Sequence, residues 1–541
     1  MGDLRFQWYD YATFSIMIAV SVVIGVYMGF WKRQDNKDEY LLGGKSMAIF
    51  PVTISLISSI ISGITLMAYP ADIYKYGSNL IWLCLTLPLI SIIYVYVFLP
   101  VLLNAEVTNL FEYFEKRFHR ACRILASLLI TLLLLVYNPI VIYIPCLAFK
   151  QASGLDVLVT APIICIICVF YTTIGGLKAV IWTDTFQFFG MVLSSVAVVV
   201  IGIIAVGGIE RVWQISLDGE RLDIFDFRFN LTIRDNFWSI IIGATFQWAS
   251  YIMINQGFFQ KCRALPTLSE CRPSVIMYGF GVAIFMLLMV ASGNIMYAKY
   301  STCDPISSNQ IFRDDQLLPY FVLEISKDVP GLPGIFVAGI FSAALSTFSS
   351  TLNTAASIIY EDFLSPFLSQ DVKQHREGLI LKVIVVSFGI ASTFLVLIIQ
   401  MLSELLPFIT ATQGIIHGPL LGLLISGILI PTVNEKGAFT GSIVALAVLS
   451  WITFGGLWYN LKGASKEFLK PTSVEGCKVF NNSSMTQNYK ENVFVLYRIS
   501  FWYITIIGVI ITVIVAIIVS LFTKRCKSLD KSLISTLLYS K

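Results

Sequence analysis

A row of hydroxyl side chains lies inside a strongly apolar stretch of this chain, SAALSTFSSTLNTAAS at residues 342–357. Its polar members are Ser342, Ser346, Ser349, Ser350, Asn353 and Ser357. At helical spacing they fall at offsets 0, 4, 7, 8, 11 and 15, which is one continuous face. Hydroxyls that bond back to their own helix explain two of these residues but not a whole stripe. Because hydroxyl oxygens are hard ligands, the stripe indicates contact with something polar, such as a hard cation.

Asp184 and Gln187, in the stretch IWTDTFQFFG, are a second candidate for cation binding. Asp184 lies about one and a half turns into an apolar run, and Gln187 follows about one turn later. Ionisable residues at membrane depth are costly and usually functional. A carboxylate beside a carboxamide offers hard oxygen ligands to a small cation. The alternative is an interfacial Asp184 that reaches cytoplasmic water.

Histidine and the other catalytic residue types form no recognisable catalytic set. Of His119, His375 and His417, only His417 lies inside an apolar run, where a hydrogen-bonded packing residue is commoner than a ligand or base. The sequence contains no Ser-His-Asp set, metal-ligand spacing or phosphate-binding loop. A membrane enzyme is therefore poorly supported.

The elements that carry these residues are predicted to be membrane spans. Of the 541 residues, 57% are hydrophobic and 13% are charged, and the mean hydropathy is +0.79. A span needs about 20 apolar residues, and such runs recur along nearly the whole chain. We therefore predict an all-α polytopic membrane protein with thirteen transmembrane helices. These are expected at residues 10–30, 48–74, 78–104, 122–149, 155–175, 179–207, 236–260, 273–298, 330–360, 379–402, 404–430, 437–458 and 500–522.

The basic residues predict an N-terminus outside and a C-terminus inside. Short cytoplasmic loops accumulate Lys and Arg, and Trp31, Lys32 and Arg33 directly follow the first span. The net charge of +4 is accounted for by the inner loops, so no nucleic-acid partner is expected. The other basic residues expected inside are Lys116, Arg117, Arg120, Lys261, Arg263, Arg272, Lys524, Arg525 and Lys527.

Two features of the predicted outer loops agree with this orientation. Glycosylation sequons begin at Asn230, Asn481 and Asn482, which predicts a glycoprotein. Cys303 and Cys477 lie in two of these loops, and we predict a disulfide between them because the outside is oxidising. The alternative is two free thiols that lie too far apart. The first apolar run lacks a basic leader, so we expect it to stay as an anchor. The outer loops are residues 208–235, 299–329 and 459–499.

Two predicted spans carry polar and small residues at their centres. A helix in lipid must satisfy its own backbone, so an interruption is tolerated only where protein or a watery cavity accepts the freed groups. We predict that both spans are unwound; small residues that let helices pack closely are the alternative. The second span, ISLISSIISGITLMAYPADIYKYG, carries Ser58, Ser59, Ser62, Gly63, Thr65 and Pro70. The seventh, GATFQWASYIMINQGFFQ, carries Gly243, Gln247, Asn255, Gln256 and Gly257.

The two interrupted spans occupy equivalent positions if the chain contains two repeats of five spans. Repeat one would comprise residues 48–207 and repeat two residues 236–430, within one transmembrane domain covering residues 1–541. Each interrupted span would then open its repeat, which points to an inverted-repeat transporter with a binding site near the midplane. The peripheral helices would be residues 10–30, 437–458 and 500–522.

Four motifs resemble those of the sodium/solute symporter family, and within it the branch of the monocarboxylate, multivitamin and iodide symporters. The likeness covers nearly all of the predicted spans. It implies a leucine-transporter type fold with five-plus-five inverted repeats and alternating access. The motifs are YPADIYKYG (69–77), YNPIVIYIPCLAF (137–149), YTTIGGLKAVIWTDTFQ (171–187) and FSAALSTFSSTLNTAASIIYEDF (341–363).

The resemblance also implies binding sites. In this family the hydroxyl stripe faces the broken second span, and together they hold a sodium ion. By motif, the ligands would be the side chains of Ser349 and Ser350 and the carbonyls of Ser346, Ser58 and Ile61. A second sodium site in this branch would match Ser59, Asp184, Gln187 and Gln256. The solute would lie against Thr65, Tyr137, Trp248 and Gln413.

We therefore expect a sodium-coupled symporter of a small organic anion, a monocarboxylate or a vitamin carboxylate, in the plasma membrane. Thr65 departs from the glutamine expected in an iodide carrier, and the polar set of sugar-transporting relatives is missing from the second span. The rival hypotheses are a non-transporting sensor or ion channel on the same fold, a carrier of iodide or sugar, and proton coupling through Asp184.

Overall fold

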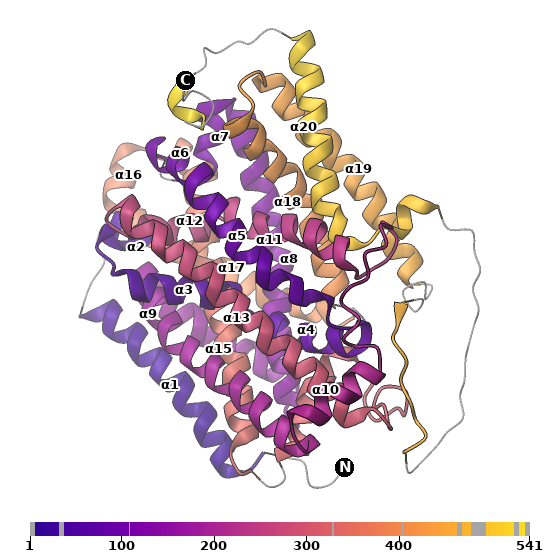
Figure 1. The fold of residues 1–541 in the computed structure, drawn as a ribbon. Helices are drawn as coiled ribbons and strands as arrows, with labels where there is room; N and C mark the ends of the chain where they lie inside the picture. Colours follow the sequence, from indigo (N-terminus) through magenta and orange to yellow (C-terminus); the bar gives the residue numbers. More distant parts are fainter. Residues whose placement is uncertain are drawn as a thin grey trace.

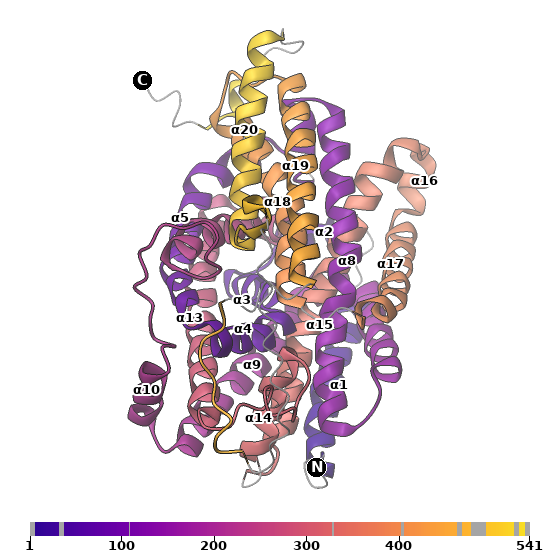
Figure 2. The ribbon, with the colours of Figure 1, turned by 90° about the vertical axis from the view of Figure 1, so that its right-hand side faces the viewer.

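The long helices of this protein run between two opposite ends of the molecule (Figure 1). Helix α1 (Trp8–Phe30) begins near the end where α10 (Ile209–Asp218) and α14 (Leu317–Ile325) lie, and α20 (Ile504–Phe522) ends at the other (Figures 1 and 2). The described residues form helices and no β-strand. The computed structural model describes residues 6–31, 37–107, 109–326, 329–401, 405–461, 468–477, 494–523 and 530–535.

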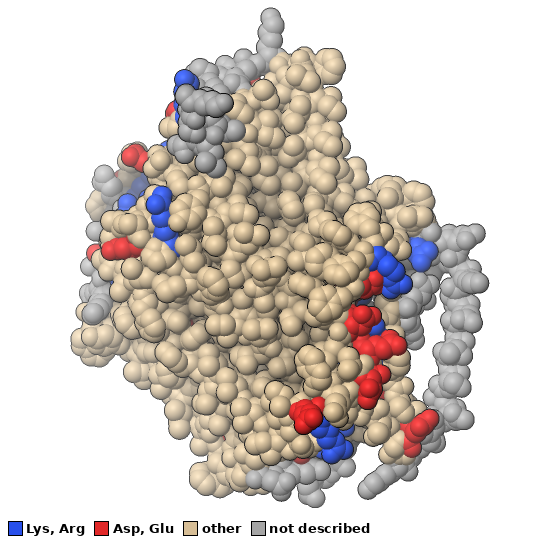
Figure 3. Space-filling view, viewed as in Figure 1, with Lys and Arg blue, Asp and Glu red and all other residues tan. Residues whose placement is uncertain are grey.

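Ten of the described helical segments are long and apolar enough to cross a membrane, or eleven when one bent pair is counted as a span. The prediction of an all-helical polytopic membrane protein is confirmed. The face drawn in Figure 3 has a broad middle zone without charged side chains, whereas Lys, Arg, Asp and Glu gather toward its edges. The ten segments are Trp8–Phe30, Asn79–Asn104, Arg120–Ser153, Val157–Val206, Leu268–Tyr300, Leu332–Phe367, Glu377–Ile399, Leu406–Leu429, Glu435–Trp458 and Phe501–Phe522.

The predicted interruption of the second span is confirmed. Helix α3 (Ile49–Ile60) and helix α4 (Gly63–Tyr76) are bent by 54° at the two residues that separate them. Both linking residues have extended backbone, with φ −82° and ψ 101° at Ile61 and φ −99° and ψ 174° at Ser62. Ser62 then starts α4 through a capping box, in which its own N–H donates to the hydroxyl of Thr65.

The seventh span is interrupted as well. Helix α11 (Thr245–Met253) is followed by its C-cap residue Ile254, and the next residue, Asn255, has extended backbone with φ −85° and ψ 110°. The side chain of Asn255 accepts the N–H of Phe258 and so caps the start of α12 (Gln256–Arg263). The helix is therefore interrupted within this span, as predicted.

The hydroxyl stripe lies on α15 (Leu332–Ile358), which is buried along almost its whole length. This helix packs against α9 (Val157–Val206), α8 (Arg120–Ser153), α3 and α1. Glycine allows the close approach of α15 to α9, because a Cβ at Gly339 would lie only 2.2 Å from the Cβ of Ser194. Helix α9 itself is divided at Gly176, where φ is 54° and ψ is −159°.

The remaining helices surround this core. Helices α18 (Leu405–Leu429), α19 (Glu435–Leu461) and α20 pack side by side as a separate group (Figure 2). The other helices are α2 (Lys37–Leu42), α5 (Leu83–Ile93), α6 (Leu99–Asn104), α7 (Glu112–Arg117), α13 (Leu268–Tyr300), α16 (Gln370–His375) and α17 (Glu377–Ile399).

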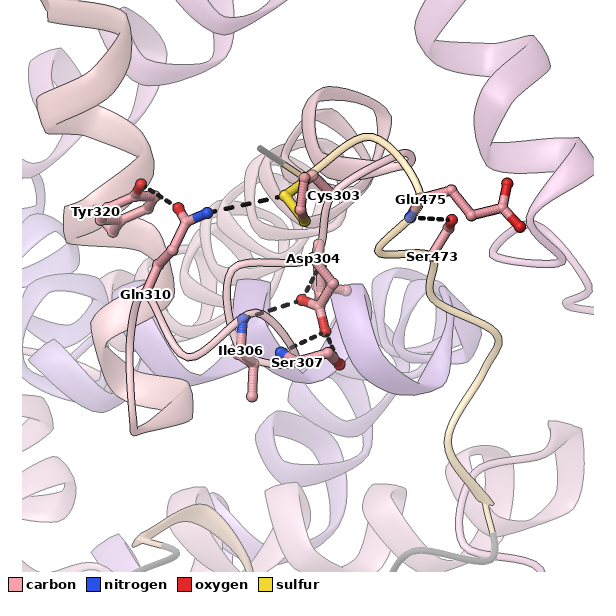
Figure 4. The surroundings of a disulfide bond; sticks show 10 residues. Cys303, Asp304, Ile306, Ser307, Gln310, Tyr320, Ser473 and Glu475 are labelled. Carbon is pink, nitrogen blue, oxygen red and sulfur yellow. Dashed lines mark hydrogen bonds between the residues drawn. A yellow bond between two sulfur atoms is a disulfide. The ribbon is translucent and has the colours of Figure 1, made fainter. Parts of the chain in front are cut away.

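A disulfide joins Cys303 to Cys477, as predicted (Figure 4). The segment 468–477 that it holds, here called the strap, also makes backbone hydrogen bonds to α4 and to the loop after α13. The N–H of Lys470 donates to the carbonyl of Lys75, and the N–H of Asp304 donates to the carbonyl of Ser473, both at 2.9 Å. Of the predicted sequons, Asn230 is exposed. Asn481 and Asn482 lie outside the described residues, as do Lys32, Arg33, Lys524, Arg525 and Lys527.

Candidate functional site

A cavity of about 110 Å³ lies at the break between α3 and α4. All four predicted solute residues, Thr65, Tyr137, Trp248 and Gln413, line it. These four residues come from helices α4, α8, α11 and α18. The first two helices belong to the first predicted repeat and the last two to the second, so the cavity lies between the repeats of the predicted scheme. The apolar part of the wall is formed by Ile60, Ile64, Leu133, Leu134, Leu406 and Ile409.

The polar part of the wall offers hydrogen bonds to a solute. The indole Nε1 of Trp248 is buried and has no hydrogen-bond partner among the described residues, so a donor is free in the wall. The hydroxyl of Tyr251 donates to the amide oxygen of Gln413. His417 also lines the cavity, and its Nδ1 lies 3.0 Å from the hydroxyl of Ser250. His417 is thus hydrogen-bonded, as its interpretation as a packing residue requires, but it also forms part of the cavity wall.

The cavity wall contains no ionised side chain. Among the described residues that line it, none is Lys, Arg, Asp or Glu. An anion loses its hydration on entering such a site, and hydrogen bonds alone compensate only part of that cost. A bound anion would therefore need a cation close by.

Hydroxyls of α15 meet the broken span beside the cavity. The hydroxyl of Ser58 donates to the hydroxyl of Ser346 at 2.7 Å. The hydroxyl of Thr347 donates to the carbonyl of Ser59 at 3.2 Å. Ser349 is buried next to them and donates to the carbonyl of Ser346 on its own helix at 3.1 Å. Of the predicted first sodium ligands, the structure thus brings Ser58 and Ser346 into direct contact, close to the break at Ile61.

Ser350, the remaining predicted ligand, already has a cationic partner. The ammonium of Lys261 lies 2.8 Å from the hydroxyl of Ser350 and 2.8 Å from Oδ2 of Asp184. The hydroxyl of Ser55 also donates to Oδ2 of Asp184, at 2.6 Å. The sequence placed Lys261 in a basic group on the inner side of the membrane; in the structure its side chain is only 2% exposed and is paired with Asp184. Lys261 lies on α12, which begins directly after the break at Asn255, and its side chain is buried in the core.

The described hydrogen bonds of the four residues of the predicted second sodium site lead to other partners. Gln187 donates to the hydroxyl of Ser21 on α1 at 3.1 Å, and Asp184 is paired with Lys261. Ser59 lines the cavity and donates to the carbonyl of Leu56. Gln256 accepts the N–H of Leu110, so its amide is engaged with the segment before α7.

A second, smaller cavity of about 40 Å³ lies along α4, and Leu406 lines both cavities. Its wall carries the ion pair of Arg234 with Asp72 and that of Lys75 with Asp314, the latter at 2.5 Å. The guanidinium of Arg234 also lies over the ring of Tyr76. Charged residues thus line this smaller cavity, in contrast to the larger one.

Asp315, in the loop before α14, contributes to the same wall. Its burial raises the pKa of its carboxyl above the usual range, and the Arg313 guanidinium opposes that rise. The guanidinium Nη2 of Arg313 lies 3.0 Å from Oδ2 of Asp315. The ion pair of Arg313 with Asp315 is therefore a third charge pair at the smaller cavity.

Several residues of the site were not predicted from the sequence. Thr347 and Thr351 lie next to Ser346 and Ser350 on α15 and line the cavity, so a wider stripe would have included them. Tyr251 follows Trp248 by three residues on α11. Lys261 gave no usable signal, because it follows an apolar run and resembles an ordinary flanking cation.

The comparisons with known proteins agree on one kind of protein. Residues 40–445 match the model of a family described as "Sodium:solute symporter family". Sodium-coupled monocarboxylate transporter 2 of Danio rerio is 36% identical over 476 residues, which are 88% of this chain and 76% of that protein. Sodium-coupled monocarboxylate transporter 1 of Homo sapiens is 32% identical over 554 residues, covering 99% and 90%.

Two further matches extend this result. The sodium/iodide cotransporter of Homo sapiens is 32% identical over 474 residues, covering 87% of this chain and 73% of that protein. A solved structure of a Na⁺-coupled sialic acid symporter, in a substrate-bound outward-open state, has a TM-score of 0.79. It is 23% identical and covers 97% of this chain and all of that chain, so the two share a fold.

Proposed function

Because this chain belongs to the sodium:solute symporter family, we propose that it carries a short-chain monocarboxylate across the plasma membrane together with sodium. It is a membrane transporter and not an enzyme, and sodium is its coupling ion. The relatives named above include transporters of monocarboxylates and of iodide. The choice between these solutes depends on the cavity.

The observation that carries the proposal is the cavity at the helix break. It has an apolar part lined by aliphatic side chains and a polar part with the free indole N–H of Trp248. A carboxylate with a short apolar tail matches both parts, whereas iodide has no tail to bury. A cavity of about 150 Å³ holds one benzene molecule. The volume of about 110 Å³ therefore favours a short monocarboxylate over a vitamin carboxylate.

The sodium site of this proposal lies where α15 meets the broken span. Ser349 and Ser350 would supply hydroxyl oxygens, and Ser58, Ile61 and Ser346 would supply carbonyls. Ser58 and Ser346 are in contact, and the backbone is extended at Ile61, which frees carbonyls from helical hydrogen bonds. Hydroxyl and carbonyl oxygens suit a hard monovalent cation. Sodium would also supply the charge that the uncharged cavity lacks.

We propose thirteen spans, with the N-terminus outside and the C-terminus inside. Helix α9 has 50 residues, about 75 Å of helix, which is more than twice the thickness of the hydrocarbon core. Counted as two spans about Gly176, together with the bent α3–α4 pair and the broken α11–α12 segment, it brings the total to thirteen. The opposite ends reached by α1 and α20 suit an odd number (Figure 1).

The fold also suits two inverted repeats, residues 48–207 and 236–430, within a single domain. Each proposed repeat opens with an interrupted span, at Ile61 and at Ile254. Glycosylation at Asn230 would follow from an outer position of the loop that contains it.

Coupling follows from the position of the sodium site. Sodium that binds between α15 and the broken span would stabilise the cavity-forming arrangement of α4, so solute affinity should rise with sodium concentration. Inward movement of each sodium ion contributes about 2.3 kcal/mol per 100 mV. The membrane potential would then drive accumulation of the solute.

The test is uptake of labelled propionate and butyrate by cells that express the chain, in sodium medium and in choline medium. Biotin and iodide serve as comparison solutes. The double variant Ser349→Ala, Ser350→Ala should reach the cell surface and lose sodium-dependent uptake. Ser342→Ala is the matched control, because it removes a hydroxyl from the same helix away from the break.

Sodium-dependent uptake of the short acids, lost in the double variant and kept in the control, supports the proposal. Uptake of iodide but not of the acids would assign the other solute class. Uptake that ignores both sodium and the double substitution would contradict the sodium site.

A further inference from the structure

A fully buried ammonium shares ligands with the proposed sodium site. Lys261 donates from Nζ to Oδ2 of Asp184 at 2.8 Å, to the hydroxyl of Ser350 at 2.8 Å and to the carbonyl of Ser55 at 3.1 Å. Its side chain is 2% exposed, and that of Asp184 is 0% exposed. All three hydrogens of the ammonium therefore have an oxygen acceptor.

The three acceptors come from three different helices. Ser55 lies on α3, the inner half of the broken span, Asp184 on α9, and Ser350 on α15. A carboxylate, a hydroxyl and a carbonyl are the oxygen types that a hard cation selects. Lys261 thus holds together the same two helices, α3 and α15, that sodium would join. The helix that carries Lys261, α12, begins just after the second interruption, at Asn255, so the ammonium also connects α12 to α3, the first half of the broken span.

We propose that the ammonium of Lys261 is an internal cation that holds Ser350 and Asp184 while the carrier contains no sodium, and that sodium displaces it from Ser350. This inference depends on the proposed sodium site. A hydroxyl that already accepts from an ammonium has little capacity for a second cation, and two cations on one oxygen repel each other. Binding of sodium and the contact between Lys261 and Ser350 are therefore alternatives.

The pair also has a consequence for the return of the empty carrier. A carboxylate buried without a partner is strongly unfavourable, whereas the pair of Asp184 with Lys261 is neutral. The sodium-free protein can therefore change conformation without an uncompensated charge in its core. Removal of the ammonium should slow this return, while the loaded carrier should still exchange solute.

The first experiment measures sodium binding without any solute. The purified full-length chain in lipid nanodiscs is titrated with NaCl against choline chloride, and the midpoint of thermal unfolding is followed. Lys261→Gln should lower the half-saturating sodium concentration by roughly three- to tenfold, because a repelling charge is removed. Lys261→Arg keeps the charge and should bind sodium less tightly than Lys261→Gln does.

The second experiment compares net uptake with exchange. Sodium-driven net uptake of labelled solute should fall in Lys261→Gln, whereas exchange at equal, saturating sodium on both sides should stay close to that of the natural chain. The double variant Asp184→Asn, Lys261→Gln contains no buried charge at this position, so it should recover net uptake. A merely structural role of Lys261 would lower both rates together.

The outcomes separate this inference from the proposed function. If sodium does not stabilise the natural chain, the proposed sodium site is wrong. If sodium stabilises it but the half-saturating concentration is unchanged or higher in both Lys261→Gln and the double variant, sodium does not displace the ammonium and the inference fails. The double variant answers this question even where Lys261→Gln does not fold.

Discussion

The two halves of the broken span are held by ion pairs in very different surroundings. Beside α3, the side chains of Lys261 and Asp184 are 2% and 0% exposed. Beside α4, those of Arg234 and Asp72 are 9% and 8% exposed, and those of Lys75 and Asp314 are 16% and 40% exposed. Since water weakens a charge pair, the energetic weight of these pairs should fall in the same order.

The two halves also differ in what else holds them. At the end of α4, Arg221 donates to the carbonyl of Tyr74 at 3.1 Å, and the hydroxyl of Tyr74 donates to Asp304 at 2.7 Å. Asp304 follows Cys303 directly (Figure 4), and Lys470 of the strap donates its N–H to the carbonyl of Lys75, so the disulfide and the strap lie against α4. The α3 half has no covalent tie of this kind among the described residues. We therefore expect sodium binding to change the stability of α3, whereas α4 is held in place by the disulfide and the strap.

The substitution Asp184→Asn should have the largest effect. It leaves the ammonium of Lys261 buried without a counter-charge, which costs about 3–5 kcal/mol when a buried pair loses one partner. The free energy of unfolding in lipid bicelles measures this loss. The double variant with Lys261→Gln should recover most of it, and a single variant as stable as the natural chain would show that the pair is not what holds α3.

Removal of the disulfide should affect the other half. The double variant Cys303→Ser, Cys477→Ser is expected to lose about 2–4 kcal/mol, because the strap is no longer fixed in the unfolded or the folded chain. Hydrogen exchange should rise at the end of α4 and not in α3. The sodium concentration that half-saturates thermal stabilisation should stay unchanged; a marked shift would mean that the strap, too, controls the sodium site.

The sequence predicted the hydroxyl stripe and both interruptions because these features are local. Serine and glycine inside an apolar run conflict with lipid whatever the rest of the chain does, and Ser58 and Ser346 indeed meet. The partner of Asp184 could not be predicted in this way. Lys261 follows an apolar run, where a cation normally marks the cytoplasmic boundary, but in the structure it lies on a buried helix after the break at Asn255.

Gln256 illustrates the same limit. The family resemblance implied that Gln256 is an ion ligand, but it lies just after the extended backbone at Asn255, and its side-chain oxygen accepts the N–H of Leu110. The direction of a side chain after an interruption depends on two backbone angles that the sequence does not specify. Residues within continuous helices, such as Tyr137 and Trp248, were therefore placed better than residues next to a break.

The substitution Arg234→Gln tests the pair of Arg234 with Asp72, whose exposure lies between those of the other two ion pairs. A glutamine still donates a hydrogen bond to Asp72, and Lys75 lies on the same helix, so the expected cost is about 1–3 kcal/mol. Increased labelling of an introduced cysteine at Ala71, which lines the smaller cavity, would report the loosened α4. A cost in unfolding free energy equal to that of Asp184→Asn would mean that the contribution of an ion pair does not depend on how deeply it is buried.

The smallest effect is expected for Asp314→Asn. The carboxylate of Asp314 is 40% exposed, so water and salt screen its attraction to Lys75, and such surface pairs contribute about 0–1 kcal/mol. Raising choline chloride should therefore reduce the difference between this variant and the natural chain further. The inner pair is shielded from the solvent and should not respond to the same salt. A cost for Asp314→Asn that persists at high salt would show that the Lys75–Asp314 pair, too, is shielded from solvent, and the contrast between the two halves would then rest on the strap alone.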